Sequence, residues 1–298
     1  VIDITDVESE NGKTSPGEAA GIKKGDYIIS AEGENIHTNE ELSAAVEASG
    51  GNRIKLLIKR NGKKKTVYIT PVTSKETGSL KIGLWVRDSS AGIGTMTFYS
   101  PYTGVVCGLG HGVCDEDTGE LLSLETGELV TAEIISLEKG ASGAPGQLKG
   151  KFTGNSIGAI DKNCENGVYS ILKGKINPSN LTEIALKQEI KDGAAQILCT
   201  LEGNTPKLYE CKIKKRSSAY LSSSQNITVT VTDKELLEKT GGIVQGMSGS
   251  PIIQNGKLVG AVTHVLIDDP TSGYGIFAEN MLKEAQTAAE ANKLKNAS

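Results

Sequence analysis

The stretch "GIVQGMSGSPIIQNGKLVGAVTHV", residues 242–265, decides the fold class. A run of small residues precedes two apolar segments that an Asn-Gly turn separates. Such a turn between two apolar segments is typical of an antiparallel hairpin. The small residues let the backbone turn sharply and bring its own amides close to a ligand. An ordinary tight turn has the same composition, so the rest of the chain must decide between the two.

The composition indicates a β protein with many turns. The chain has 298 residues, 36 glycines, 8 prolines and only 4% aromatic residues, and its length suits about two domains. The formal net charge of -4 argues against a nucleic-acid partner, which usually needs a concentrated basic face. The one strongly basic run, residues 59–67, surrounds an Asn-Gly turn and is predicted to be an exposed hairpin tip.

Residues 1–73 are predicted to form one domain. Residues 38–51 combine a Thr cap, an acid three positions later and a Gly-Gly end, which predicts a short amphipathic helix. Residues 53–72 predict two strands joined by an Asn-Gly turn. The segment "AAGIKKGDYIISAEGENI", residues 19–36, resembles the core of a PDZ domain. That resemblance implies a peptide ligand that adds as a strand, with residues 1–7 as the receiving strand.

The remainder is predicted to be a linker over residues 74–82 and a second domain over residues 83–298. The second domain contains about eleven short apolar segments separated by turns, and a helical pattern only at its C-terminal end, from residue 278. This pattern predicts a mainly β fold built as a barrel or sandwich, with two six-stranded barrels as the form considered.

The candidate catalytic residues are Ser248 and His111. A serine hydroxyl is a weak nucleophile until a base accepts its proton, and imidazole titrates in the suitable range. His111 lies between glycines in "CGLGHGVCD", residues 107–115, which leaves its ring accessible. The amides of Gly246 and Ser248 are predicted to form the oxyanion hole. The order of these motifs resembles trypsin-like serine proteases, and the resemblance assigns the nucleophile to Ser248 rather than Ser250.

Three segments carry a closer resemblance: "GLGHGVCD" (108–115), "GASGAPGQLKG" (140–150) and "LLEKTGGIVQGMSGSPII" (236–253). With the preceding PDZ-like domain, they resemble the stage IV sporulation protein B family, the signalling serine peptidases of endospore-forming bacteria. The resemblance implies a chymotrypsin-like double β-barrel, self-cleavage, and cleavage of a membrane-embedded regulatory complex that activates a sporulation sigma factor. It also implies action between the mother-cell and forespore membranes.

The resemblance places the third member of the triad at Asp233. Two alternatives stay open: Asp233 is a first-turn acid of a helix capped by Thr232 and Glu235, or Asp161 is the orienting acid. His264 lies on the strand after the Ser248 loop and is predicted to line the substrate pocket, or to be an ordinary histidine at a strand edge.

No cofactor and no metal site are expected. The five cysteines lack C-x-x-C pairs, and a zinc site usually needs a second ligand pair. Cys107 and Cys114, which bracket His111, are interpreted as free thiols, with a disulfide as the alternative. No segment has the apolar length of a membrane span. Since the chain begins with Val, we expect a preceding segment that directs secretion or anchors the protein. The alternative function is a PDZ-type scaffold with an inactive protease-like domain.

Overall fold

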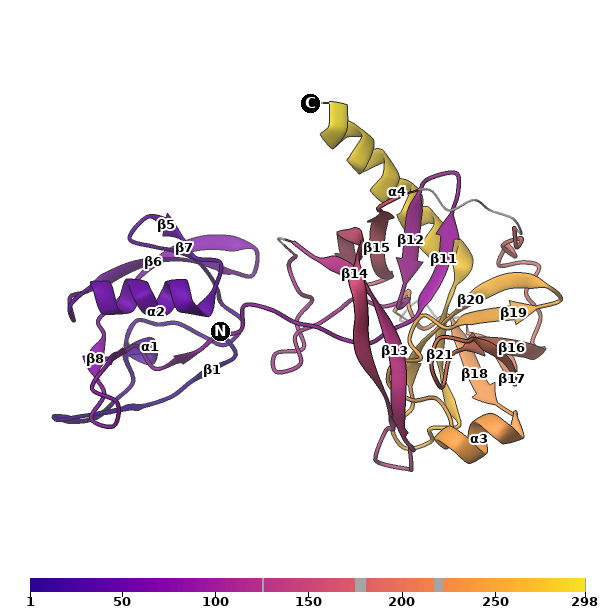
Figure 1. Cartoon of the computed structure of the whole chain (residues 1–298), viewed down its shortest axis with the longest axis horizontal. Helices are drawn as coiled ribbons and strands as arrows, with labels where there is room; N and C mark the ends of the chain where they lie inside the picture. The colour runs from indigo at the N-terminus through magenta and orange to yellow at the C-terminus, as the bar shows by residue number, and fades with distance from the viewer. Residues whose placement is uncertain (125, 175–180, 217–221, 298) are drawn as a thin grey trace. The chain divides into compact units, whose positions relative to one another are not determined.

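The computed structural model describes residues 1–124, 126–174, 181–216 and 222–297. The chain forms two compact units (Figure 1). The first unit comprises Val1–Ala91 and Cys114–Glu120, and the second comprises Gly92–Val113 and Leu121–Ser298. None of the described helices combines the length and the apolar character needed to cross a bilayer.

The first unit is a small α/β domain around a four-stranded sheet in the order β5-β4-β6-β7. Its helices are α1 (Pro16–Ala19) and α2 (Asn39–Ala48). A capping box of Thr38 and Glu41 starts α2 as predicted. The strands are β1 (Asp3–Ile4), β2 (Val7–Ser9), β3 (Gly12–Thr14), β4 (Tyr27–Ala31), β5 (Glu34–Asn35), β6 (Ile54–Arg60), β7 (Lys63–Ile69), β8 (Val72–Thr73), β9 (Leu80–Lys81) and β10 (Leu84–Trp85).

The first unit extends beyond the predicted boundary at residue 73. Strand β9 pairs with β8, and β10 pairs antiparallel with β1, with Asp3 opposite Trp85. Ile82 is buried in the core of this unit, and Leu80 and Leu84 pack against that core. Apolar residues at alternate positions of an extended segment share one face, which explains why residues 80–86 add to this domain. One edge of β1 is therefore occupied by β10, although the sequence analysis assigned residues 1–7 to receive a ligand.

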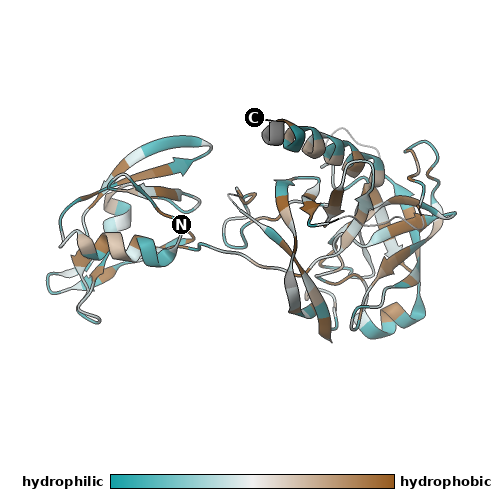
Figure 2. Cartoon of the chain, turned by 45° about the horizontal axis from the view of Figure 1, so that its top comes forward, coloured by the Kyte–Doolittle hydropathy of each residue, from teal (hydrophilic) through white to brown (hydrophobic). Residues whose placement is uncertain are grey.

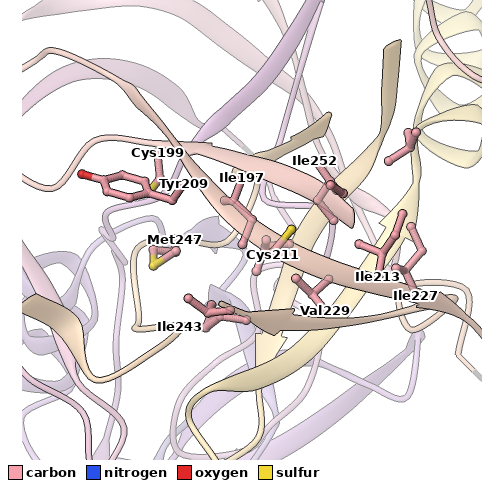
Figure 3. Packing of buried hydrophobic residues seen from close by; sticks show 14 of the residues in the cluster. Ile197, Cys199, Tyr209, Cys211, Ile213, Ile227, Val229, Ile243, Met247 and Ile252 are labelled. Carbon is pink, nitrogen blue, oxygen red and sulfur yellow. The ribbon is translucent and has the colours of Figure 1, made fainter. Parts of the chain in front are cut away.

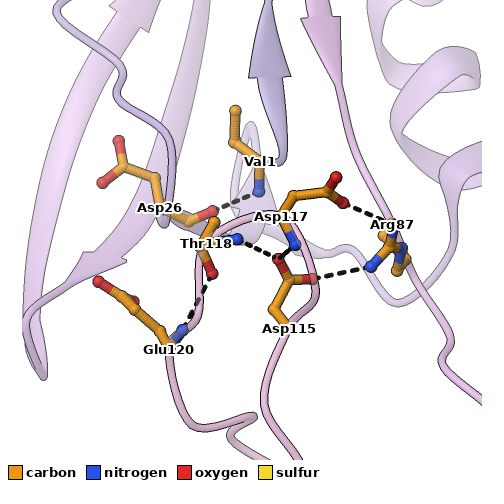
Figure 4. A network of polar contacts seen from close by, with 7 residues as sticks. All are labelled: Val1, Asp26, Arg87, Asp115, Asp117, Thr118 and Glu120. Atoms are coloured by element: carbon orange, nitrogen blue, oxygen red, sulfur yellow. Dashed lines mark hydrogen bonds and ion pairs between the residues drawn. The ribbon is translucent and has the colours of Figure 1, made fainter. Parts of the chain in front are cut away.

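A polar network explains why Cys114–Glu120 belongs to the first unit (Figure 4). Arg87 donates to Asp115 at 3.1 Å and to Asp117 at 2.7 Å. The other carboxylate oxygen of Asp115 accepts from the amides of Asp117 and Thr118. The Asp115 carboxylate thus fixes its own turn and holds Arg87. Burial alone would raise the pKa of Asp115, but these hydrogen bonds and the charge of Arg87 outweigh burial and lower it.

The second unit contains a five-stranded antiparallel sheet and a closed six-stranded barrel. The sheet order is β11-β12-β15-β14-β13, and the barrel order is β16-β17-β18-β21-β20-β19. The sheet strands are β11 (Met96–Ser100), β12 (Val105–Gly108), β13 (Glu128–Glu138), β14 (Gln147–Cys164) and β15 (Gly167–Leu172). The barrel strands are β16 (Gly193–Cys199), β17 (Lys207–Lys215), β18 (Ile227–Val231), β19 (Pro251–Gln254), β20 (Lys257–Val265) and β21 (Ser272–Phe277). The helices are α3 (Lys234–Thr240) and α4 (Ala278–Ala297).

Alternation of apolar and polar residues along the barrel strands builds its interior. In β17 and β18 alternate residues are buried, because successive side chains of a strand point to opposite faces. Figure 3 shows these inward residues packed together, among them Ile197, Ile213 and Val229. Met247, directly before Ser248, is fully buried in the same cluster. The nucleophile loop is thereby anchored to the barrel core.

Helix α4 joins the sheet and the barrel through a separate apolar cluster. Met281 and Ala285 of the helix pack with Cys107 and Tyr169 of the sheet and with Ile276 of the barrel. Brown and teal segments alternate along α4 in Figure 2, as expected for a helix with one buried face. The predicted fold class, mainly β with a small first domain and a double β-barrel, is confirmed: the second unit is rich in β-barrel structure, with one closed six-stranded barrel and one five-stranded sheet in place of the second barrel.

Candidate active site

The Ser248 loop presents two backbone amides without partners. Gly246 and Gly249 have φ angles of +96° and +91°, a region that favours glycine. The amides of Met247, Gly249 and Ser250 donate to backbone carbonyls at 2.7 to 3.1 Å. Within the described part of the chain, the amides of Gly246 and Ser248 have no hydrogen-bond partner. These are the two amides assigned to the oxyanion hole, and two such donors are what a developing oxyanion requires.

Ser248 and Ser250 differ in their exposure. Ser248 is half-buried, and its Oγ donates to the carbonyl of Thr263 at 2.8 Å. Ser250 is fully buried. Of the two serines in the motif, Ser248 is the one with exposed surface.

A close backbone approach brings the Ser248 loop and the His111 loop together. A Cβ atom on Gly249 would lie 2.0 Å from the carbonyl oxygen of Thr95 and 2.6 Å from the amide nitrogen of Leu109. Leu109, two residues before His111, has a φ of +64°. A Cβ on Gly110 would lie 2.9 Å from the side chain of Thr263. The glycines thus permit two turns to pack backbone against backbone.

The ring of His111 lies beside that of His264. Their centroids are 4.8 Å apart, and the ring planes are tilted by 37°. Nδ1 of His111 is 2.8 Å from the carbonyl oxygen of Gly112. Burial lowers the pKa of His111 below 6.5, although the Gly112 hydrogen bond opposes this shift. The side chain of His264 is exposed, but partial burial of its ring and the adjacent His111 lower its pKa too. Both shifts favour the neutral form of imidazole.

The proton-transfer pair is not engaged in this arrangement. Among the described hydrogen bonds, none joins His111 to Ser248, because the hydroxyl donates to Thr263 and Nδ1 of the ring bonds Gly112. Catalytic hydrogen bonds of this kind often form only when substrate is bound.

Asp233 is the N-cap of α3. Its carboxylate accepts from the amides of Leu236 at 3.0 Å and Glu210 at 3.2 Å. The alternative prediction that Thr232 caps this helix is therefore wrong by one residue. No described hydrogen bond joins Asp233 to His111. Asp161 lies on β14.

Two threonines that sequence reasoning missed hold the Ser248 loop. The Thr95 amide donates to the Ser248 carbonyl at 2.8 Å, and its Oγ1 donates to the Gly246 carbonyl at 3.2 Å. Thr97 Oγ1 donates to the Gly249 carbonyl at 2.7 Å. Residues i and i+2 of an extended segment share a face. The spacing of the two threonines in "GTMTF", residues 94–98, was thus a signal, but it does not say what that face contacts.

Asn163 fixes the chain directly after the His111 loop. Its side-chain oxygen accepts from the Val113 amide at 2.8 Å, and its nitrogen donates to the carbonyls of Val113 and Leu122. Val113 and Leu122 flank the Cys114–Glu120 segment of the first unit. The Asn163 side chain therefore holds both ends of the Cys114–Glu120 segment. No sequence pattern indicated this role for Asn163.

The cysteines near His111 are free thiols in the structure, as interpreted from the sequence. Cys107 is buried on β12, and Cys114 is exposed. Burial raises the pKa of the Cys107 thiol far above its ordinary value, so this side chain acts as a small apolar core residue.

These features define a class: a PDZ-like domain joined to a β-barrel unit in which a glycine-rich serine loop packs against a histidine loop. The chain belongs to the SpoIVB peptidase S55 family, which it matches over residues 78–282. Residues 10–60 match the PDZ domain family.

The chain is also similar to parts of two curated proteins. It is 32% identical over 101 residues to the zinc metalloprotease RasP of Geobacillus kaustophilus, a match that covers 26% of this chain and 24% of that protein. It is 37% identical over 70 residues to a putative zinc metalloprotease of Clostridium acetobutylicum, covering 24% of this chain and 21% of that protein. The chain spans less than a quarter of the length of these relatives.

Proposed function

We propose that the chain is a serine endopeptidase with Ser248 as nucleophile and His111 as general base. The observation that carries the proposal is the pair of amides, Gly246 and Ser248, that have no partner among the described residues and belong to the loop of the partly exposed Ser248. Nδ1 of His111 faces a carbonyl oxygen, which only accepts, so Nδ1 carries the hydrogen and Nε2 keeps its lone pair. A neutral imidazole in this tautomer is the form that accepts a proton from serine.

In the proposed reaction Ser248 Oγ attacks the carbonyl carbon of the scissile peptide bond while Nε2 of His111 takes its proton. The two amides stabilise the oxyanion. The same imidazolium then protonates the leaving amine, and water hydrolyses the acyl-enzyme by the reverse sequence. Asp233 is retained as the proposed orienting acid, and His264 as a residue of the substrate pocket.

From the family we infer that the substrates are proteins: the chain itself and a membrane-embedded regulatory complex whose cleavage activates a sigma factor during endospore formation. The proposed place of action is the space between the mother-cell and forespore membranes, reached through a segment that precedes residue 1.

The PDZ domain is proposed to bind a peptide at β10 instead of at residues 1–7. The carbonyls of Gly83 and Trp85 accept from the amides of Thr5 and Ile2 on the β1 side. Because backbone groups alternate in direction along a strand, those of Leu84 point to the opposite edge. The Leu80 amide donates to the Glu47 carboxylate, and the Asn39 amide donates to the Asp88 carboxylate. Residues 80–88 therefore run alongside α2. A peptide strand adding to β10 would lie beside that helix, the mode described for PDZ domains.

Fluorophosphonate labelling and, on separate unlabelled samples, intact-mass spectrometry over time test the proposal. The parent chain and Ser250→Ala should take up one label when treated and release self-cleavage fragments when untreated, whereas Ser248→Ala should do neither. Ser250→Ala is a matched control because it changes the neighbouring serine of the same loop.

A second candidate function is a PDZ-type scaffold with an inactive peptidase unit. The uncoupled Ser248 and His111 favour it. Absence of label and of fragments in every variant, with intact folding, would support this candidate over the enzyme.

A further inference from the structure

Two of the three histidines of this chain, far apart in sequence, meet beside the nucleophile loop. The ring centroids of His111 and His264 lie 4.8 Å apart, and the residue before His264 supplies the carbonyl that binds Ser248 Oγ. We propose that His111 and His264 together bind one Zn²⁺ ion, and that the bound ion inhibits the peptidase. The inhibition rests on the proposed role of His111 as base, whereas the binding does not.

The separation of the rings is close to the one that a zinc ion requires. Zinc lies ~2.0–2.1 Å from an imidazole nitrogen, which puts each ring centroid ~3.2 Å from the metal and, at a tetrahedral angle, the two centroids ~5.2 Å apart. The observed 4.8 Å corresponds to an angle of ~97° at the metal for the same bond lengths. A small rotation of either ring supplies the difference.

The hydrogen bonding of the two rings also suits a metal. The Gly112 carbonyl fixes the hydrogen of His111 on Nδ1, leaving Nε2 as the ligand atom. A backbone carbonyl bonded to the second ring nitrogen is a usual support for a zinc-binding histidine. No described hydrogen bond occupies the ring of His264.

The proposed site is exchangeable and not structural. Among the described residues, no group of three or more His, Cys, Asp or Glu side chains is placed to hold a metal ion. Two protein ligands leave the other positions of the ion to water, unlike the four protein ligands of structural zinc sites. Such a site fills and empties with the zinc concentration. It suits control of the enzyme, and neither folding nor catalysis depends on it.

The consequence for catalysis is direct. A zinc ion on Nε2 of His111 occupies the lone pair that must accept the proton of Ser248, so the hydroxyl stays protonated and does not attack. Two coordinate bonds form to neutral nitrogens, bound water leaves the ion, and no covalent bond breaks. The inhibition is therefore reversible by a chelator.

Isothermal calorimetry of the full chain with ZnCl₂ tests the binding, with MgCl₂ as the control for a hard cation. His111→Asn and His264→Asn should each weaken zinc binding at least tenfold. His37→Asn, the remaining histidine, and Cys114→Ser, the exposed thiol, should bind one ion per chain as the parent does. Absence of zinc binding in the parent, or binding lost only in His37→Asn or Cys114→Ser, overturns the proposal.

Two further measurements keep the test valid if a histidine variant fails to fold. In the parent chain, zinc should protect His111 and His264, but not His37, from modification by diethylpyrocarbonate, as read by peptide mass spectrometry. Zinc should also block fluorophosphonate labelling of Ser248, and a chelator should restore it. Zinc binding with unchanged labelling would refute the proposed inhibition but not the proposed zinc site. Zinc binding in a chain that never labels refutes the proposed function but not the site.

Discussion

The contact between Gly249 and the Leu109 backbone offers a quantitative test of the site geometry. Gly249→Ala places a methyl group 2.0 Å from the Thr95 carbonyl oxygen and 2.6 Å from the Leu109 amide nitrogen. Both neighbours are backbone atoms, so no side-chain rotation relieves the overlap. The φ of +91° adds the strain of a left-handed conformation, ~1–2 kcal/mol for a residue with a Cβ. Overpacking adds ~1–3 kcal/mol, for a total of about 2–5 kcal/mol.

Gly256→Ala is the matched control for this substitution. Gly256 has a φ of +77°, and a Cβ there meets no atom within 4 Å. Only the backbone strain applies, ~1–2 kcal/mol. At roughly 3 °C per kcal/mol for a unit of this size, thermal unfolding of the second unit should shift by about 6–15 °C for Gly249→Ala and by about 3–6 °C for Gly256→Ala.

Differential scanning calorimetry measures both shifts, and fluorophosphonate labelling well below the unfolding temperature measures the site. Labelling of Ser248 should fall in Gly249→Ala, because the loop must move away from the His111 loop, and should stay at the parent level in Gly256→Ala. Equal shifts in the two variants, together with full labelling of Gly249→Ala, would refute the backbone contact on which the site geometry depends.

Three further predictions concern an ion pair, the thiols and a histidine. Arg60→Met should destabilise the first unit by ~3–5 kcal/mol, because it leaves buried Asp26 without its guanidinium partner. Urea unfolding measures this free energy, and the double variant with Asp26→Asn should recover part of it. Cys114, the exposed thiol, should react first with Ellman's reagent, while Cys199 and Cys211, whose pKa burial raises to about 12, react only after unfolding. The pKa of His264 is lowered to about 4 in the folded chain, so between about pH 6.5 and 4 this side chain takes up a proton when the chain unfolds. The free energy of unfolding should therefore fall as the pH falls through this range, and it should fall less in His264→Asn.

The sequence predicted the elements with local signals and missed those that depend on distant contacts. The helix after Thr38, the Gly-rich loop at Ser248 and the alternating barrel strands each carry their signal within a few residues. The boundary of the first unit carries no such local signal. Residues 80–82 were predicted to belong to the linker and residues 83–86 to begin the second domain, yet their apolar members complete the core that residues 22–69 form.

The same distinction applies to the site. Ser248 and His111 were recognisable because glycines must surround a tightly turned loop. The roles of Thr95, Thr97 and Asn163 depend on which loop their strand meets, and a hydrogen bond between distant residues leaves no periodicity in the sequence. The contact between the rings of His111 and His264 also joins residues far apart in the chain and leaves no pattern in the sequence. Sequence alone proposed a pocket role for His264 but gave no sign that the two rings touch.

The third member of the triad is where sequence and structure can be tested against each other most sharply. The family resemblance assigns Asp233, while the structure gives its carboxylate two backbone amides at the start of α3. Asp233→Asn separates the two roles. An asparagine caps a helix about as well as an aspartate, so the bond to Leu236 survives and only the Glu210 bond is lost, for ~1 kcal/mol of stability.

If Asp233 orients His111 during turnover, Asp233→Asn should lower labelling of Ser248 by orders of magnitude while the protein stays folded, because an amide favours the wrong tautomer of the imidazole. Labelling rate and urea unfolding, measured on the same preparation, give both quantities. A loss of about 1 kcal/mol with unchanged labelling would restrict Asp233 to the helix cap. In that case Asp161→Asn becomes the next variant to measure, and the Gly112 carbonyl, already bonded to Nδ1, becomes the group that sets the tautomer of His111.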